Sequence, residues 1–216
     1  MTDAVVVSVA RTAIGKAFRG AFNDTEAPAL GGHVVRAVLE RAGIDATRVD
    51  DVIVGAAAQQ GTQAYNLGRL CAYTGGLPNT VSGMTLDRQC ASGLMSIGIA
   101  AKTIMAGEQD VVIAGGLESI SLVQNKHKNS YRAVSKAAIA AEPTAYIPMI
   151  ETAEIVAARY GISRSMQDEL AVSSQQRAAR AIAEGRQLFL NLDDADPSEG
   201  AFSGLDVQNS KAGLAL

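Results

Sequence analysis

Short β-branched runs alternate with longer stretches of helical spacing over the first 120 residues, and this alternation constrains the fold more than any other feature. The predicted strands are Val5–Val9, Val52–Val54, Val81–Leu86 and Asp110–Gly116. The predicted helices cover residues 30–42, 67–74 and 90–107, the last with an apolar face of Leu94, Ile97, Ala101, Ile104 and Met105. Strands joined by right-handed helical crossovers lie parallel, with helices on both faces of their sheet. The sequence therefore predicts an α/β fold with a mostly parallel sheet sandwiched by helices.

The pattern changes after Ser121, and a second, mainly helical part is predicted from there on. Two amphipathic helices are expected, one from about Glu151 to Tyr160 and one from Ser165 to Glu184, and a glycine follows each. Ser165, with Asp168 three residues later, is typical of a helix start. The residues from Gln187 onward show no clear period.

Composition and charge exclude several functional classes. Hydrophobic residues make up 48% of the 216 residues, which is enough for a sizeable core and excludes wholesale disorder. The formal net charge is −3, whereas dedicated nucleic-acid binders present a basic surface. No apolar run approaches the roughly 18 residues of a membrane span, and the N-terminus lacks the basic start of a signal peptide. We therefore expect a cytoplasmic protein with no nucleic-acid partner and no membrane span.

The two cysteines, Cys71 and Cys90, and the two histidines, His33 and His127, predict no metal centre. The cysteines form neither a disulfide framework nor a Cys-x-x-Cys motif. His33 falls on a predicted helix and His127 in a basic loop, so neither has the context of a catalytic base. We expect both histidines to be structural or solvated.

Cys90 is the candidate nucleophile, because it lies between a predicted strand and a long predicted helix. Unpaired backbone N–H groups at a helix N-terminus favour a thiolate and can stabilise an oxyanion on an attacked carbonyl. The small residues that follow, Ala91, Ser92 and Gly93, leave room for a bulky substrate. The competing interpretation is a buried structural cysteine, and it fits Cys71, on an apolar helix face, better.

Several motifs resemble the thiolases, the family of acetyl-CoA acetyltransferases and 3-ketoacyl-CoA thiolases. Asp87-Arg88-Gln89-Cys90-Ala91-Ser92-Gly93-Leu94 resembles the family's nucleophile motif. Other matching segments are Val9–Lys16, Asn66–Arg69, Ala72–Pro78, Ala114–Ser121 with Ile120 where Met is usual, and Pro148-Met149 with Glu151–Glu154. The resemblance runs in order from residue 5 to about 186.

The resemblance implies a thiolase fold and cysteine-mediated acyl transfer between a 3-ketoacyl-CoA and CoA, in either direction. Cys90 would accept the acyl group, its backbone N–H would contribute to the oxyanion hole, and Met149 with Pro148 would line the acyl pocket. Residues 1–121 would form the N-terminal domain, and residues 122–216 part of the loop domain that covers the site. CoA would act as substrate, no further cofactor is implied, and the family assembles as homodimers or homotetramers.

Three departures from the family accompany these matches. Pro148 stands where many acetoacetyl-CoA thiolases carry His, which favours substrates longer than acetoacetyl-CoA, and Ile150 replaces a Gly, which we expect to narrow the pocket. The resemblance stops near Arg186, before the Gly-His-Pro and Cys-Gly-Gly-Gly segments that hold the family's base and second cysteine. These 216 residues are therefore expected to form an incomplete enzyme that lacks the C-terminal half-fold. The half that is present would expose the apolar face that normally packs against the other half, and this face would cause dimerisation or aggregation.

Two rival functions and three minor motifs stay open to test. A non-catalytic thiolase-like subunit that binds acyl-CoA or assembles with a partner is the main alternative, and a β-ketoacyl synthase-like enzyme is the second.

Gly115-Gly116 is too short for a dinucleotide loop. The aspartates Asp193, Asp194 and Asp196 are predicted to form an acidic surface, and not a metal cage. Lys126, Lys128 and Arg132 either meet CoA phosphates or a neighbouring subunit, or form a solvated loop.

Overall fold

The computed structural model describes residues 3–184, which fall into two compact units. The first unit extends to Lys128 and the second begins at Asn129, and each is described by itself. The segment from Gln187 onward, in which no clear period was predicted, lies outside the described residues, and so does the predicted acidic surface of Asp193, Asp194 and Asp196.

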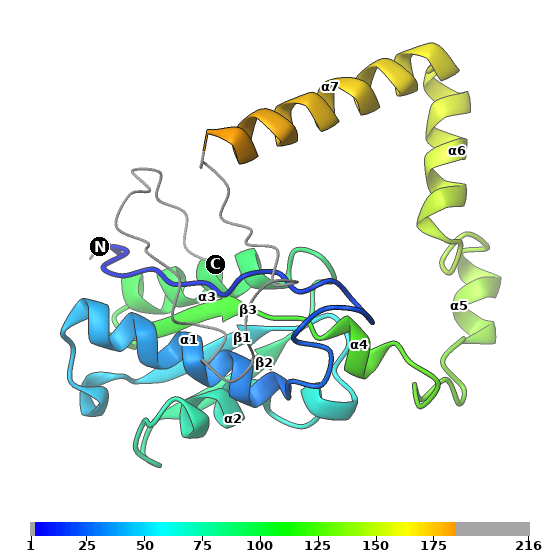
Figure 1. Ribbon diagram of the computed structural model, residues 1–216. Helices are drawn as coiled ribbons and strands as arrows, with labels where there is room; N and C mark the ends of the chain where they lie inside the picture. The colour runs from blue at the N-terminus through cyan, green and yellow to red at the C-terminus, as the bar shows by residue number, and fades with distance from the viewer. Residues whose placement is uncertain (1–2, 185–216) are drawn as a thin grey trace. The chain divides into compact units, whose positions relative to one another are not determined.

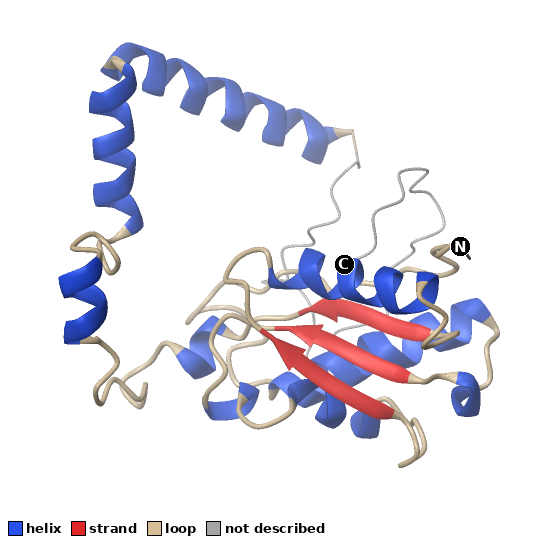
Figure 2. Cartoon of the chain, turned by 180° about the vertical axis from the view of Figure 1, so that it is seen from behind, coloured by secondary structure: helices blue, strands red, loops and turns tan. Residues whose placement is uncertain are grey.

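A parallel sheet forms the centre of the first unit. Its strands are β1 (Asp51–Gly55), β2 (Ser82–Leu86) and β3 (Val112–Gly116), in the order β2-β1-β3 (Figure 2). Ile53 of β1 lies opposite Met84 of β2 and Ala114 of β3, and both pairings are parallel. The predicted parallel arrangement is therefore confirmed for these three strands.

Helices cover both faces of this sheet, as the crossover rule requires. Helices α1 (Ala27–Ala42) and α2 (Leu67–Thr74) pack together on one face, and α3 (Ser92–Met105) packs on β1 and β3 from the other (Figure 1). The short elements of this unit are η1 (Ala46–Arg48), η2 (Gly61–Gln63) and α4 (Ile120–Val123). The core lies between the sheet and the α1–α2 pair and includes Val52, Val54, Leu67 and Cys71.

Helix α3 is less buried than its apolar pattern predicts. Leu94 is 62% exposed and Met105 is 42% exposed, although both were expected on a buried face. The buried residues of α3 are instead Ser92, Ser96 and Ala100. The prediction was wrong at these two positions because the sheet covers only one side of α3, and Leu94 and Met105 do not lie on that side.

The predicted N-terminal strand Val5–Val9 does not form. Val5, Val6 and Val7 are 67–73% exposed, and the segment runs extended without joining the three-stranded sheet. Together with β3, α1 and α3 it lines a groove of about 630 Å³. A β-strand exists only where a neighbouring strand satisfies its backbone, and among residues 3–184 none pairs with this segment.

Between Asn129 and Glu184, the regular secondary structure of the second unit is helical. It contains α5 (Lys136–Ala141), α6 (Met149–Tyr160) and α7 (Arg164–Ala183), and α6 ends at Gly161 with the left-handed φ of +62° that glycine permits. Within residues 3–184, no helix is both long and apolar enough to cross a membrane.

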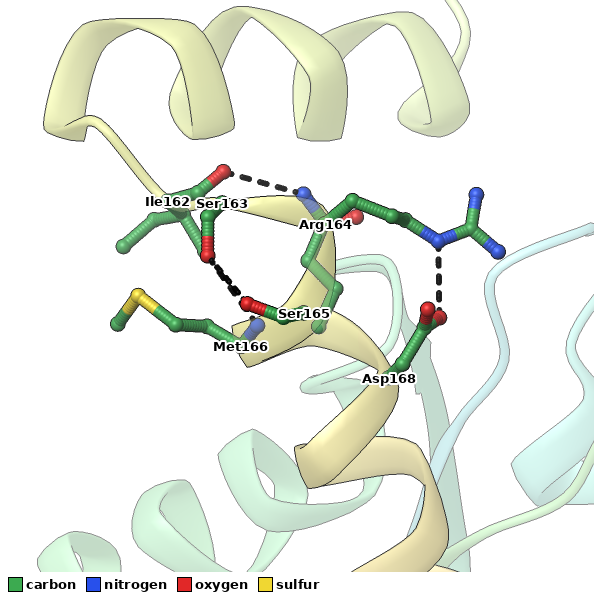
Figure 3. Close-up of polar contacts among 7 residues, drawn as sticks. Ile162, Ser163, Arg164, Ser165, Met166 and Asp168 are labelled. Atoms are coloured by element: carbon green, nitrogen blue, oxygen red, sulfur yellow. Dashed lines mark hydrogen bonds and ion pairs between the residues drawn. The ribbon is translucent and has the colours of Figure 1, made fainter.

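The start of α7 differs from the prediction (Figure 3). The side chain of Ser163, and not that of Ser165, accepts a hydrogen bond from the backbone N–H of Met166, at 3.3 Å. Asp168 pairs instead with the guanidinium of Arg164, at 2.8 Å. The helix begins at Arg164, so the residue just before it is the one whose hydroxyl faces the free N–H groups of the first turn.

Candidate active site

Cys90 lies where the carboxyl ends of the three parallel strands meet the following loops. It stands in the connection between β2, which ends at Leu86, and α3, which begins at Ser92, and it is exposed. Its place just before the helix N-terminus agrees with the sequence-based expectation. In open α/β sheets, ligands bind outside the carboxyl ends of the strands, so this edge is the natural place for a substrate.

The loop that carries Cys90 is held on both sides of the cysteine. The Ser92 hydroxyl accepts a hydrogen bond from the backbone N–H of Arg88 at 2.8 Å and donates one to the carbonyl of Gln89 at 2.6 Å. The Asp87 carboxylate accepts from the backbone N–H of Gln89 at 2.6 Å. Gln89 adopts a left-handed φ of +49°, which costs about 1–3 kcal/mol in a non-glycine residue and persists only where surrounding contacts hold it.

The ends of β1 and β3 lie directly against the first turn of α3. A side-chain carbon placed on Gly55 would lie 2.3 Å from the carbonyl carbon of Ser92, and one on Gly116 would lie 2.9 Å from the Cα of Gly93. The fully buried Ser96 hydroxyl shares its single proton between the carbonyl oxygens of Gly93, at 2.6 Å, and Gly115, at 2.7 Å. The backbone at the start of α3, which follows Cys90, therefore packs directly against the backbone at the ends of β1 and β3.

Sequence reasoning singled out neither Ser92 nor Ser96 as positioning residues. Both are polar residues at i and i+4 on one helix face, and this face is the buried one. A pair of small hydroxyl residues on the inner face of the helix that follows a nucleophile was the available signal, but only the structure shows which face is the inner one.

Cys71 has the opposite environment to Cys90. It lies on α2 with its side chain fully buried, and a side-chain carbon on Gly31 of α1 would approach its sulfur to 2.3 Å. Burial raises the pKa of the Cys71 thiol to about 12, so the thiolate is scarce at neutral pH. The predicted structural role of Cys71 agrees with this burial.

The histidines and the basic residues lie elsewhere in the chain. His33 is half-buried on α1, and burial, with a smaller effect from Arg36, lowers its pKa. His127 is exposed, and its backbone N–H donates to the side chain of Asn125. Lys126, Lys128 and Arg132 are exposed, and their role stays a prediction. Within residues 3–184, no group of three or more His, Cys, Asp and Glu side chains is placed to hold a metal ion.

The two predicted pocket residues belong to the second unit, whereas Cys90 belongs to the first. Pro148 precedes α6, and Met149 is its first residue and is 79% exposed. Ile150, which was expected to narrow the pocket, is 80% exposed. The structure of the second unit therefore leaves these side chains open to contact.

Comparison with known proteins gives one consistent result. The family model described as the thiolase N-terminal domain matches residues 4–189. The chain is 43% identical over 186 residues to a 3-ketoacyl-CoA thiolase of Bacillus subtilis, covering 86% of this chain and 47% of the relative. It is 41% identical over 197 residues to an acetyl-CoA acetyltransferase of Escherichia coli, covering 86% and 49%.

A solved structure agrees with these relatives. The crystal structure of the Bacillus anthracis acetyl-CoA acetyltransferase matches with a TM-score of 0.70 and 34% identity, over 86% of this chain and 49% of that one. The chain thus spans about half the length of the curated relatives that it matches.

Proposed function

The chain belongs to the thiolase family, whose N-terminal domain it matches, and from this we propose that it acts in thiolase-type acyl transfer with Cys90 as the acyl acceptor. The observation that carries the proposal is the position of Cys90. It is the exposed cysteine of the two, and it stands before a helix N-terminus at the carboxyl edge of a parallel sheet.

The chemistry of the first step follows from this position. The Cys90 thiolate attacks the thioester carbonyl of an acyl-CoA, and the carbonyl oxygen becomes an oxyanion to which the backbone N–H of Cys90 donates. The intermediate then collapses: the bond from the acyl carbon to the CoA sulfur breaks, CoA leaves as a thiolate that takes up a proton, and the acyl group remains on the Cys90 sulfur. In the second step the carbanion of acetyl-CoA attacks the acyl carbon, the bond from that carbon to the Cys90 sulfur breaks, and a 3-ketoacyl-CoA leaves with Cys90 as a thiolate. In the direction of thiolysis, the Cys90 thiolate attacks the 3-keto carbon and the bond between carbons 2 and 3 breaks. Acetyl-CoA then leaves as a carbanion that takes up a proton, and a CoA thiolate takes the acyl group from Cys90.

The proposed substrates are CoA thioesters. Two relatives are named 3-ketoacyl-CoA thiolase and acetyl-CoA acetyltransferase, and both names describe acyl transfer to or from CoA. The resemblance of the Pro148 segment to thiolases of broader chain length favours 3-ketoacyl-CoA substrates longer than acetoacetyl-CoA, with Met149 against the acyl chain. No further cofactor is part of the proposal.

Domain roles, assembly and location complete the proposal. Residues 1–121 would act as the catalytic N-terminal domain and residues 122–216 as part of the loop domain that covers it. A homodimer or homotetramer in the cytoplasm is expected by analogy with the family. Light scattering of the purified protein and cell fractionation test these two points.

Turnover requires groups beyond Cys90. A base must deprotonate the incoming thiol or the acetyl carbon, and an acid must reprotonate the leaving group. By resemblance these groups belong to Gly-His-Pro and Cys-Gly-Gly-Gly segments, and the 216 residues contain neither. We therefore expect these 216 residues alone to accept an acyl group without multiple turnover.

The experiment compares the protein with its Cys90→Ala and Cys71→Ala variants. Acetyl-CoA is added and acylation is followed by intact mass, and cleavage of acetoacetyl-CoA with added CoA is followed in parallel. Acylation that is lost in Cys90→Ala and kept in Cys71→Ala supports the proposal. Cysteine-dependent multiple turnover refutes the expected incompleteness, and no acylation at all favours the rival, a non-catalytic subunit that binds acyl-CoA or assembles with a partner.

A further inference from the structure

Glu118 is a half-buried carboxylate that the proposed chemistry does not use. It follows β3 by two residues, and its oxygens accept hydrogen bonds from the backbone N–H groups of Ala57 at 2.8 Å and Ala58 at 3.3 Å, just after β1. It also accepts one from the side-chain amide of Gln63, at 2.8 Å. One carboxylate thus ties together the loops that follow two neighbouring strands.

Gln63 completes the connection from the other side. It is fully buried, its amide nitrogen also donates to the carbonyl of Ala58 at 2.9 Å, and its amide oxygen accepts from the backbone N–H of Ser119. We call the set of Glu118, Gln63 and Ser119 with Ala57 and Ala58 the carboxylate bracket. Because each polar atom of the Gln63 side chain has a partner, a shift of either loop relative to the other breaks hydrogen bonds of the bracket.

The bracket lies next to the backbone that supports Cys90. Gly55, two residues before Ala57, is in backbone contact with Ser92, and Gly116, two residues before Glu118, is in backbone contact with Gly93. A shift between the ends of β1 and β3 therefore moves the first turn of α3, since these contacts leave no free space. The backbone N–H of Cys90, which is the proposed oxyanion donor, lies just before that turn.

We infer that Glu118 is a positioning residue for acyl transfer to Cys90: it holds the ends of β1 and β3 so that the thiolate and the oxyanion donors keep their relative placement. The inference rests on the proposed function. Alkylation by iodoacetamide needs only the thiolate, whereas acylation by a thioester also needs the oxyanion donors. The two reactions at the same sulfur therefore separate positioning from simple access to Cys90.

The chain offers a matched control at the opposite end of the same strands. The Asp50 carboxylate, just before β1, accepts hydrogen bonds from the backbone N–H groups of Asp110 at 2.8 Å and Val111 at 3.0 Å, just before β3. Asp50→Asn and Glu118→Gln thus remove the same kind of contact between the same two strands. Only Glu118 lies at the end where Cys90 lies.

The experiment measures the rate of Cys90 acylation by acetyl-CoA and the rate of its alkylation by iodoacetamide, across pH, in each folded variant. In Glu118→Gln, the new amide N–H faces one of the N–H groups that donated to the carboxylate, so this hydrogen bond is lost. We expect acylation to slow by roughly 10- to 100-fold, which is less than the loss of rate that follows complete removal of an oxyanion donor. We expect alkylation and its pH midpoint to stay within about twofold and about 0.3 pH units in that variant, and Asp50→Asn to acylate at nearly the normal rate.

If Glu118→Gln does not fold, Gln63→Met takes its place in the experiment, because it removes one of the three donors to Glu118. It should slow acylation by about 3- to 10-fold, since the remaining two donors still hold the carboxylate. An unchanged acylation rate, an equal loss in Asp50→Asn, or a shifted alkylation midpoint overturns the inference while the proposed function stands. A protein that alkylates at Cys90 but takes no acyl group from acetyl-CoA refutes the proposed function, and the inference with it.

Discussion

Replacing Gly55 with alanine should disturb the support of Cys90 more than the same replacement at Gly116. The new carbon would lie 2.3 Å from the carbonyl carbon and 2.4 Å from the oxygen of Ser92, and 2.7 Å from the nitrogen of Gly93. All three are backbone atoms, so no side-chain rotation relieves the contact. Carbon atoms in contact lie about 3.5–4.0 Å apart, so β1 and the start of α3 must separate by about 1 Å or more.

The expected loss of stability follows from this displacement. Overpacking in a well-packed core costs about 1–3 kcal/mol, and a backbone-to-backbone clash belongs at the upper end, near 3 kcal/mol. At 1.4 kcal/mol for each tenfold change, this is a fall of roughly 100-fold or more in the folding equilibrium constant. Separation of the Ser92 turn from β1 should also slow acylation of Cys90 by acetyl-CoA.

Gly98→Ala is the matched control, because nothing lies within 4 Å of its new carbon. Gly98 is in the interior of α3, where alanine should raise the stability by about 0.5–1 kcal/mol. Urea denaturation followed by far-UV circular dichroism measures both changes. A Gly55→Ala protein within about 0.5 kcal/mol of the parent would refute the close packing on which this reasoning depends.

Three further predictions follow from the environments of single side chains. Iodoacetamide at pH 8 should label Cys90 well before Cys71, because burial raises the pKa of Cys71 to about 12 and leaves about one thiolate in ten thousand; peptide mapping that finds both labelled equally in the native protein contradicts this. Ser96→Ala should lower the free energy of unfolding by about 1–2 kcal/mol, because it removes the fully buried hydroxyl that bonds the carbonyls of Gly93 and Gly115, whereas Ser163→Ala at the exposed helix cap should lower it by only about 0.5–1 kcal/mol. Denaturation curves that rank the two variants in the opposite order would contradict this prediction. Burial lowers the pKa of His33 in the folded state below its usual 6.5, so the unfolded chain binds the proton more readily and the stability should fall as the pH drops below about 6.5, then level off below the folded pKa. His33→Gln should flatten this part of the pH–stability curve, and an unchanged curve would exclude the contribution of His33.

The sheet illustrates where local pattern suffices. β1, β2 and β3 lie within about two residues of the predicted runs, because each run is short and bounded by turn or polar residues, and those of β1 and β3 are apolar. Val5–Val9 satisfies the same criteria but forms no strand, since pairing depends on a neighbour that no local pattern reveals. The exposure of Leu94 and Met105 has a related cause: spacing shows that a helix has an apolar side, but the neighbouring element decides which residues are covered.

By itself the sequence determined the order of strands and helices and the place of Cys90 between a strand and a helix, because these depend on residues near one another in the chain. It also carried the motifs by which the family is identified. Only the tertiary structure decided that Gly55 and Gly116 touch the first turn of α3, and that Glu118 and Gln63 join loops 55 residues apart in the sequence. Such contacts form where crossovers bring distant strand ends together, and they depend on distances of tenths of an ångström that no residue pattern encodes.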